Sequence, residues 1–267
     1  MPAETQTAPF PSEEQTPLLT EANELPASEP SAQQEHPTLH PRDDRPAYSL
    51  SALLDAHRQL SHRTGMAWVA VLGIWIWIVT VWVTVLTHPA GIFTIHPIFQ
   101  SFSLFCFYHG IIFLQPTDTP AAKRTGLVVH ESFQLLGSLA IVVGGSAIFY
   151  NKVSHSAPHF TSWHGLLGLT STCLILFQAL FGMLIGFETS RDYIVGDSLG
   201  RKLWKFHRAS GYLLIFLMTM TVLTVTKADW VISVTSKWSI WVLTVSPIVA
   251  LIGLLSLVNP NKIFGRR

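Results

Sequence analysis

The sequence predicts an all-α integral membrane protein with six transmembrane helices, in which spans two to five form a four-helix bundle. Two observations predict this class. Hydrophobic residues make up 49% of the 267 residues and charged residues only 12%, about half the charged share of a soluble domain. Six apolar runs, most of them about 20 residues long, follow a polar N-terminal tail, and such runs are long enough to cross ~30 Å of hydrocarbon.

The first segment of the chain, residues 1–57, is rich in Pro, Glu, Gln, Ser and Thr. It offers too little apolar surface to offset chain entropy, so we expect a disordered tail. It lacks the basic start and apolar core of a signal peptide. The stretch from Glu14 to Leu19 resembles an acidic dileucine sorting signal, which favours a vacuolar, lysosomal or other endomembrane location. The predicted six-span domain covers residues 58–258, and a short basic tail covers 259–267.

The six predicted spans follow in order, joined by short connections that favour antiparallel neighbours in a bundle. Trp residues lie near several of their ends, as in an interfacial aromatic belt. The predicted spans are 66–87, 97–114, 126–150, 163–187, about 205–226 and about 238–258.

Lys and Arg in the connections predict the orientation. Twelve lie on the side of the N-terminus and three on the opposite side, Lys152, Lys227 and Lys237. Cytoplasmic connections carry the excess of positive charge, so both termini are expected in the cytosol.

Four histidines stand near the starts of spans two to five: His96, His130, His164 and His207. Because successive spans run in opposite directions, they sort into an outer pair, His96 with His164, and an inner pair, His130 with His207. Two neutral imidazoles that face each other suit a six-coordinate haem iron that transfers electrons. The sequence therefore predicts two b-type haems, one for each pair, with their irons ~20 Å apart.

The spacing of the histidines supports this assignment. The interval from His96 to His130 is the same as that from His130 to His164, and each interval is one span and one connection. His109 suggests a rival geometry, because its distance along the chain from His96 is typical of proteins that stack two haems between the same two helices. None of the other three histidines is followed by a histidine at that distance, so we interpret His109 as a core or boundary histidine.

With these residues in place, the chain resembles the cytochrome b561 family, six-span dihaem proteins that pass electrons from ascorbate across a membrane. The segments that carry the resemblance are Ile95-His96-Pro97, His130-Glu-Ser-Phe-Gln134, Trp163-His164-Gly165 and Phe206-His207-Arg-Ala-Ser-Gly211. It covers about residues 58–258 and is closest to the small members that consist of this domain alone. The resemblance implies that cytosolic ascorbate reduces the inner haem and that the outer haem reduces monodehydroascorbate or ferric iron.

The donor side departs from the family pattern. Ascorbate-using members carry lysines five and nine residues before the third-span histidine, where this chain has Thr125 and Ala121. Nearby positive charge attracts an anionic donor and the haem propionates. The candidate donor residues are Lys123, Arg124, Lys205 and Arg208, and the candidate acceptor residues on the other side are Lys152, His155 and His159.

Charge and cysteine content argue against several other classes of function. A net charge of +1 gives no basis for binding nucleic acid, and Cys106 and Cys173 form no metal or redox motif. The partners that the resemblance implies are an ascorbate-like donor and a monodehydroascorbate or ferric chelate acceptor. Membrane lipid is a further expected partner, and a homodimer is left open. A haem-containing redox sensor or scaffold is the alternative. A transporter is disfavoured because the span interiors hold almost no ionisable residues away from the histidines.

Overall fold

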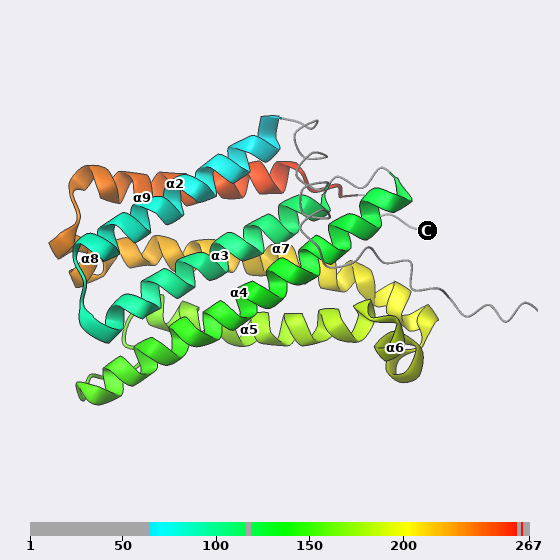
Figure 1. Ribbon diagram of the computed structural model, residues 1–267, viewed down its shortest axis with the longest axis horizontal. Helices are drawn as coiled ribbons and strands as arrows, with labels where there is room; N and C mark the ends of the chain where they lie inside the picture. The colour runs from blue at the N-terminus through cyan, green and yellow to red at the C-terminus, as the bar shows by residue number, and fades with distance from the viewer. Residues whose placement is uncertain (1–64, 116–118, 261–262, 264–267) are drawn as a thin grey trace, which may run out of the picture. The chain divides into compact units, whose positions relative to one another are not determined.

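A computed structural model describes residues 65–115, 119–260 and 263 of the chain (Figure 1). The predicted tail 1–57, with its dileucine-like stretch, lies outside the described residues, as do residues 261, 262 and 264–267 of the basic tail. Every regular element in the described ranges is a helix. The long helices are α2 (Gly65–Thr87), α3 (Ile95–Leu114), α4 (Pro120–Ser154), α5 (Trp163–Gly186), α7 (Asp197–Thr224) and α9 (Lys237–Ser256).

Short helical segments join the long ones. A 3-10 turn, η1 (Gly91–Thr94), leads into α3, and a second, η3 (Val225–Lys227), follows α7. The connection from α5 to α7 holds α6 (Glu188–Ser190) and the π-helical turn η2 (Arg191–Val195), and α8 (Asp229–Val234) precedes α9. This α5–α7 connection was expected to be a loop as far as Trp204. Instead, α7 begins at Asp197, directly after Gly196, whose φ of 81° lies in the left-handed region that glycine adopts readily.

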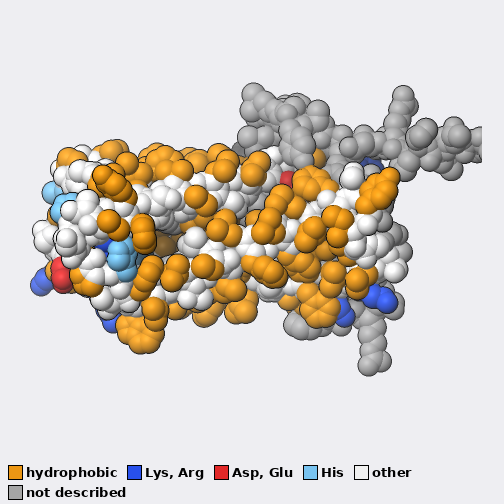
Figure 2. Space-filling view, turned by 90° about the horizontal axis from the view of Figure 1, so that it is seen from below, with side chains coloured by type: hydrophobic (Ala, Val, Ile, Leu, Met, Phe, Trp, Pro, Cys, Tyr) orange, Lys and Arg blue, Asp and Glu red, His pale blue; other side chains and the backbone are white. Residues whose placement is uncertain are grey.

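In the part of the chain that the structure describes, six helices are long and apolar enough to cross a membrane, which confirms the six predicted spans. Their large apolar side chains are exposed where lipid would surround them: Phe177 is 68% exposed and Leu72 57%. Figure 2 shows hydrophobic side chains along the middle of the face in view, with Lys, Arg and His side chains at its two ends. This distribution is that of an integral, multi-pass membrane protein.

Helix α4 is longer than the predicted third span, 126–150. Thr119 caps its N-terminus, accepting a hydrogen bond from the backbone nitrogen of Ala122 at 3.1 Å, and Pro120 occupies the first turn. A hydroxyl cap followed by proline starts a helix without help from apolar residues. The start of α4 therefore precedes the apolar run, and Lys123 and Arg124 lie in its first turns rather than in a loop.

The long helices pack in close pairs: α2 with α9, α3 with α4, and α5 with α7. Small residues at the contacts let two backbones approach, as is common between transmembrane helices. A Cβ on Gly253 of α9 would lie 2.6 Å from the backbone nitrogen of Ala70 in α2. At the α3–α4 contact, a Cβ on Gly137 would lie 2.7 Å from the ring of Phe107.

Few contacts join the pair α3/α4 to the pair α5/α7. One of these is the buried hydrogen bond of 2.9 Å between the hydroxyls of Tyr108 in α3 and Thr219 in α7. The space between the two pairs is where the four histidines lie. This arrangement gives spans two to five the predicted form of a four-helix bundle.

Candidate functional site

The outer pair lies where α3 and α5 begin. His96 and His164 are each the second residue of their helices. Their imidazole rings face each other with 6.1 Å between ring centroids and an angle of 81° between ring planes. Metal–nitrogen bonds of about 2 Å on opposite sides of one ion place two such rings roughly 6 Å apart. The separation of the outer pair therefore fits a single metal ion held between the two rings.

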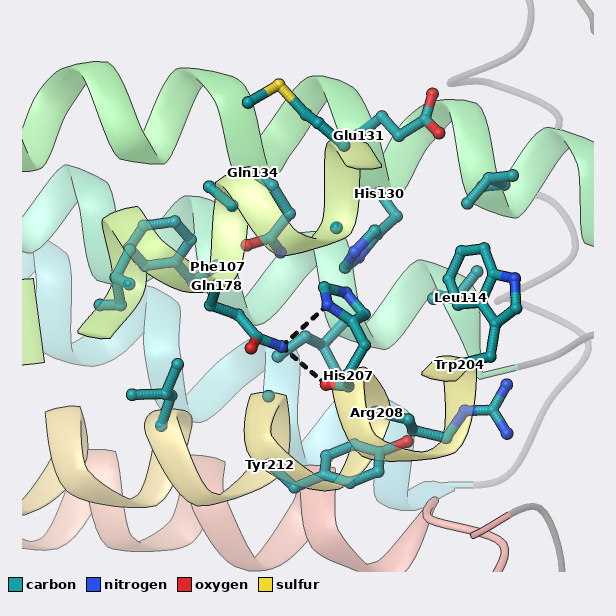
Figure 3. Close-up of a pocket in the computed structure, with 18 of the residues that line it drawn as sticks. Phe107, Leu114, His130, Glu131, Gln134, Gln178, Trp204, His207, Arg208 and Tyr212 are labelled. Carbon is teal, nitrogen blue, oxygen red and sulfur yellow. Dashed lines mark hydrogen bonds between the residues drawn. The ribbon is translucent and has the colours of Figure 1, made fainter. Parts of the chain in front are cut away.

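The inner pair lies deeper in its helices than predicted. His130 and His207 are each the eleventh residue, in α4 and α7 respectively, whereas the sequence predicts them near the starts of their spans. The difference arises because both helices begin with polar turns before the apolar run. Figure 3 shows the two imidazoles pointing toward each other from α4 and α7.

Each histidine is held through its Nδ1 atom by the neighbouring helix of its pair. Nδ1 of His96 donates to the carbonyl oxygen of Gly144 at 3.0 Å, and Nδ1 of His130 donates to that of Gly110 at 3.1 Å. Nδ1 of His164 donates to the carbonyl oxygen of Thr221, also at 3.1 Å. A carbonyl oxygen can only accept, so these three imidazoles carry their proton on Nδ1 and leave Nε2 free to bind a metal.

The partner of the fourth histidine is a side chain. The side-chain nitrogen of Gln178 lies 3.1 Å from Nδ1 of His207. In all four cases the partner lies fourteen residues after the other histidine of the helix pair: Gly110 after His96, Gly144 after His130, Gln178 after His164 and Thr221 after His207.

This reciprocity determines the separation of the pairs. Fourteen residues are about four helical turns, or about 21 Å. Each helix therefore presents its histidine at one depth and its supporting group at the other, on one face.

The inner pair lines a cavity of about 2010 Å³ between α3/α4 and α5/α7. Its walls are largely apolar, with leucines and isoleucines from all four helices. Two polar groups in the wall, the side-chain nitrogen of Gln134 and the hydroxyl of Ser138, are buried without a hydrogen-bond partner. Buried polar groups rarely remain unpaired, so these atoms indicate a ligand with both apolar and polar parts.

A porphyrin fits these features. Its ring is apolar, it has polar substituents, and its iron needs only two ligands from the protein. Within the described residues, no group of three or more His, Cys, Asp or Glu side chains comes close enough to hold a bare metal ion. The donor sets are pairs of imidazoles, which suit iron that already has four nitrogen ligands from a macrocycle.

Positive charge lies at the rim of the same cavity. Three of the four candidate donor residues line it, namely Lys123, Lys205 and Arg208, and Lys202 joins them, whereas Arg124 does not. Figure 3 shows Arg208 beside His207 and Trp204. The structure thus places most of the predicted donor residues next to the inner pair.

The three candidate acceptor residues lie together where α4 ends, near the other end of the bundle. Each already makes a local contact. Lys152 donates to the carbonyl oxygen of Pro158 at 2.7 Å, and Nδ1 of His155 donates to that of Asn151 at 2.7 Å. The ring of His159 packs against Phe149, with 4.8 Å between ring centroids. Acceptor binding by these three residues stays a prediction.

His109 does not join either pair. It is 6% exposed, and its Nδ1 donates to the carbonyl oxygen of Phe105 one turn earlier. Aromatic rings surround it, with Trp75 from α2 and Phe133 from α4 among them. This environment is that of the core histidine that we expected.

The sequence reasoning did not identify Gln178 and Gly182, two residues of α5 that contact His207. A Cβ on Gly182 would lie 2.7 Å from Cε1 of the His207 ring. Gly182 follows His164 by five full helical turns, so it shares the histidine's helix face. An isolated glutamine and a glycine on that face were the available signals.

A comparison with protein-family models decides the family. The model of the eukaryotic cytochrome b561 matches residues 87–231, more than half of the chain and a segment that contains all four histidines. The chain belongs to the cytochrome b561 family. No curated protein matches it. Members of this family are transmembrane oxidoreductases that bind b-type haem and transfer electrons, and the six-span helical fold of this chain agrees with that.

Proposed function

We propose that this chain carries electrons across its membrane from a cytosolic ascorbate-like donor to monodehydroascorbate or ferric iron on the other side. The observation that carries the proposal is the pairing of the histidines at two depths about 21 Å apart, each supported by a reciprocal hydrogen bond. A b-type haem between two imidazoles supplies one-electron transfer without an open coordination position. We assign His130 and His207 to one haem and His96 and His164 to the other.

The protein's own groups serve three purposes in this function. The paired helices hold the imidazoles in fixed orientations, which keeps reorganisation on electron transfer small. The apolar cavity walls exclude water from the bound cofactor. The positive rim formed by Lys123, Lys202, Lys205 and Arg208 attracts an anionic donor. Thr125 and Ala121, at the positions of the family's usual lysines, give the rim a different arrangement, so we propose an ascorbate-like donor rather than ascorbate alone.

The direction of transport rests on the distribution of positive charge. The excess of Lys and Arg on the side of the N-terminus supports cytosolic termini, which places the inner pair and its basic rim on the cytosolic side. We further propose that residues 58–258 form the electron-transfer domain, with cytosolic tails at 1–57 and 259–267, and that the protein resides in a vacuolar, lysosomal or other endomembrane.

The test is electron transfer into sealed vesicles. Purified full-length chain is reconstituted into liposomes that contain ferricyanide, and ascorbate is added outside. In vesicles with the wild-type chain, we expect the absorbance of the trapped ferricyanide to fall. In vesicles without protein, and in vesicles with His207→Ala, we expect this absorbance to persist. With His96→Ala, we expect ascorbate to produce a reduced-haem spectrum while the ferricyanide persists.

Two other outcomes would contradict the proposal. Ascorbate-reducible haem without loss of trapped ferricyanide would indicate a haem-containing sensor or scaffold. Properly folded protein that lacks haem, yet takes up solute in response to an ion gradient, would indicate a transporter.

A further inference from the structure

The support of His207 differs in kind from that of the other three histidines. At the equivalent places, fourteen residues after the other histidine of the helix pair, His96, His130 and His164 each find a backbone carbonyl. His207 finds the side chain of Gln178. A backbone carbonyl is present whatever the side chain, whereas an amide side chain can be changed by one substitution. The hydrogen bond at His207 is therefore specified by residue identity.

Gln178 fastens α5 to α7 at this point (Figure 3). Its side-chain nitrogen lies 3.1 Å from Nδ1 of His207 and donates to the carbonyl oxygen of the same residue at 2.6 Å. The hydroxyl of Ser210, one turn along α7, donates to the side-chain oxygen of Gln178 at 2.9 Å. The ring also packs against Gly182, where an added Cβ would lie 2.7 Å from Cε1 of His207. Gln178 and Gly182 together determine where the ring lies.

An imidazole that binds iron through Nε2 keeps its proton on Nδ1, and that proton needs an acceptor. A half-turn of the Gln178 amide exchanges its nitrogen and oxygen, which brings an acceptor to Nδ1. The same turn gives up the hydrogen bond from the amide nitrogen to the carbonyl oxygen of His207, so the amide must also move away from that carbonyl. Ser210 can follow this change, because a hydroxyl accepts as well as donates. An iron-bound His207 therefore requires Gln178 to exchange its hydrogen bond to the His207 carbonyl oxygen for one accepted from Nδ1.

We propose that Gln178 is the positioning residue of His207, and that the hydrogen bond it accepts from Nδ1 sets the redox potential of the haem at the inner pair separately from that at the outer pair. This inference rests on the proposed assignment of one haem to each pair. Its physical basis is that the acceptor on Nδ1 determines how strongly the imidazole donates electrons to iron. A stronger acceptor stabilises the oxidised iron and lowers the potential.

Two substitutions of Gln178 change the acceptor in opposite directions. Gln178→Glu offers a carboxylate, a stronger acceptor than an amide, and should lower the inner potential. Gln178→Leu removes the acceptor and should raise it. At a fixed electrode potential, we expect the ratio of oxidised to reduced inner haem to change about tenfold in Gln178→Glu, or about 59 mV for one electron, and to change in the other direction in Gln178→Leu.

The measurement is a spectroelectrochemical titration of purified full-length protein with redox mediators, without donor or acceptor substrate. The titration is repeated in a His96→Ala background, where the inner haem is observed alone. Thr170→Val is the control on the same helix. Thr170 is not among the residues that line the cavity, and its hydroxyl donates to the carbonyl oxygen of Leu166 at 2.9 Å within α5, so both potentials should stay at the wild-type values. Ser210→Ala should produce a smaller shift of the inner potential alone.

The results separate this proposal from the proposed function. Opposite shifts of the inner potential in the two Gln178 variants support it, as does selective loss of the inner haem in Gln178→Leu with the outer haem retained. Unchanged potentials in both variants, or equal changes at both haems, would overturn it. A wild-type haem content other than two per chain would refute the dihaem assignment itself, and this result is obtained before any potential is measured.

Discussion

The imidazole of His207 packs against Gly182, at a place where a single Cβ would lie 2.7 Å from its Cε1 atom. Because Gly182 packs against the ring and Gln178 lies at its Nδ1, the ring cannot easily shift to make room for an added Cβ. The position of His207 therefore depends on a residue of α5 without a side chain.

We expect Gly182→Ala to displace the His207 ring and to weaken haem binding at the inner pair. Overpacking of this kind typically costs about 1–3 kcal/mol. Haem content per chain and thermal unfolding of the purified protein measure the effect. Gly168→Ala on the same helix is the control, because the nearest atom to its Cβ would be Thr221 Cγ2 at 3.8 Å, an ordinary contact. If Gly182→Ala retains both haems with wild-type stability, the close packing of His207 is not needed for binding.

Removal of one histidine from either pair should remove one haem. We expect the pyridine haemochrome assay to give one haem per chain for His96→Ala and for His130→Ala, and two for the wild type. His88→Ala, at an exposed position after α2, should keep both. His109→Leu should keep both as well, because the described residues whose rings contact His109 are Trp and Phe, and none is another histidine. Loss of a haem in His109→Leu would instead support the rival geometry, in which His96 and His109 on the same helix each bind one of two stacked haems.

The basic rim should act through charge. We expect Lys123→Gln to raise the KM for ascorbate about threefold at low salt and to leave kcat unchanged, because the lysine attracts the anion without touching iron. The difference from wild type should shrink at about 1 M salt, where the Debye length is about 3 Å. Lys237→Gln, at the start of α9, is the matched control, and it should behave as wild type. An equal effect of both substitutions would argue against a donor site at the cavity.

The contact between α2 and α9 should determine stability without affecting the cofactor. A Cβ on Gly253 would lie 2.6 Å from the backbone nitrogen of Ala70, and neither backbone can yield without separating the helices. We expect Gly253→Ala to destabilise the protein by about 1–3 kcal/mol, visible as a lower Tm by circular dichroism, with an unchanged haem spectrum in the folded state. Gly65→Ala, where nothing lies within 4 Å of the added Cβ, should leave Tm at the wild-type value.

Helix α4 begins before the apolar run from which the sequence predicts it. Its apolar run predicts a span over 126–150, and the structure has a helix over Pro120–Ser154, because Thr119 and Pro120 start the helix before the apolar run begins. Hydrophobicity reports the part of a helix that contacts lipid, whereas capping determines where the helix begins. Polar turns that precede the apolar run likewise place both His130 and His207 about three turns inside their helices rather than near the start.

The sequence by itself determined the class, the number of spans and the four histidines, because apolar length and the repeated spacing of His96, His130 and His164 are properties of the chain alone. The helical period also places Gly110, Gly144, Gln178 and Thr221 on the faces that carry the histidines. Only the tertiary structure decided that these groups meet the Nδ1 atoms of a neighbouring helix. That contact depends on which helices pair, how closely their glycines let them approach, and how far one helix is shifted along the other, and none of these quantities is contained in the spacing of one helix.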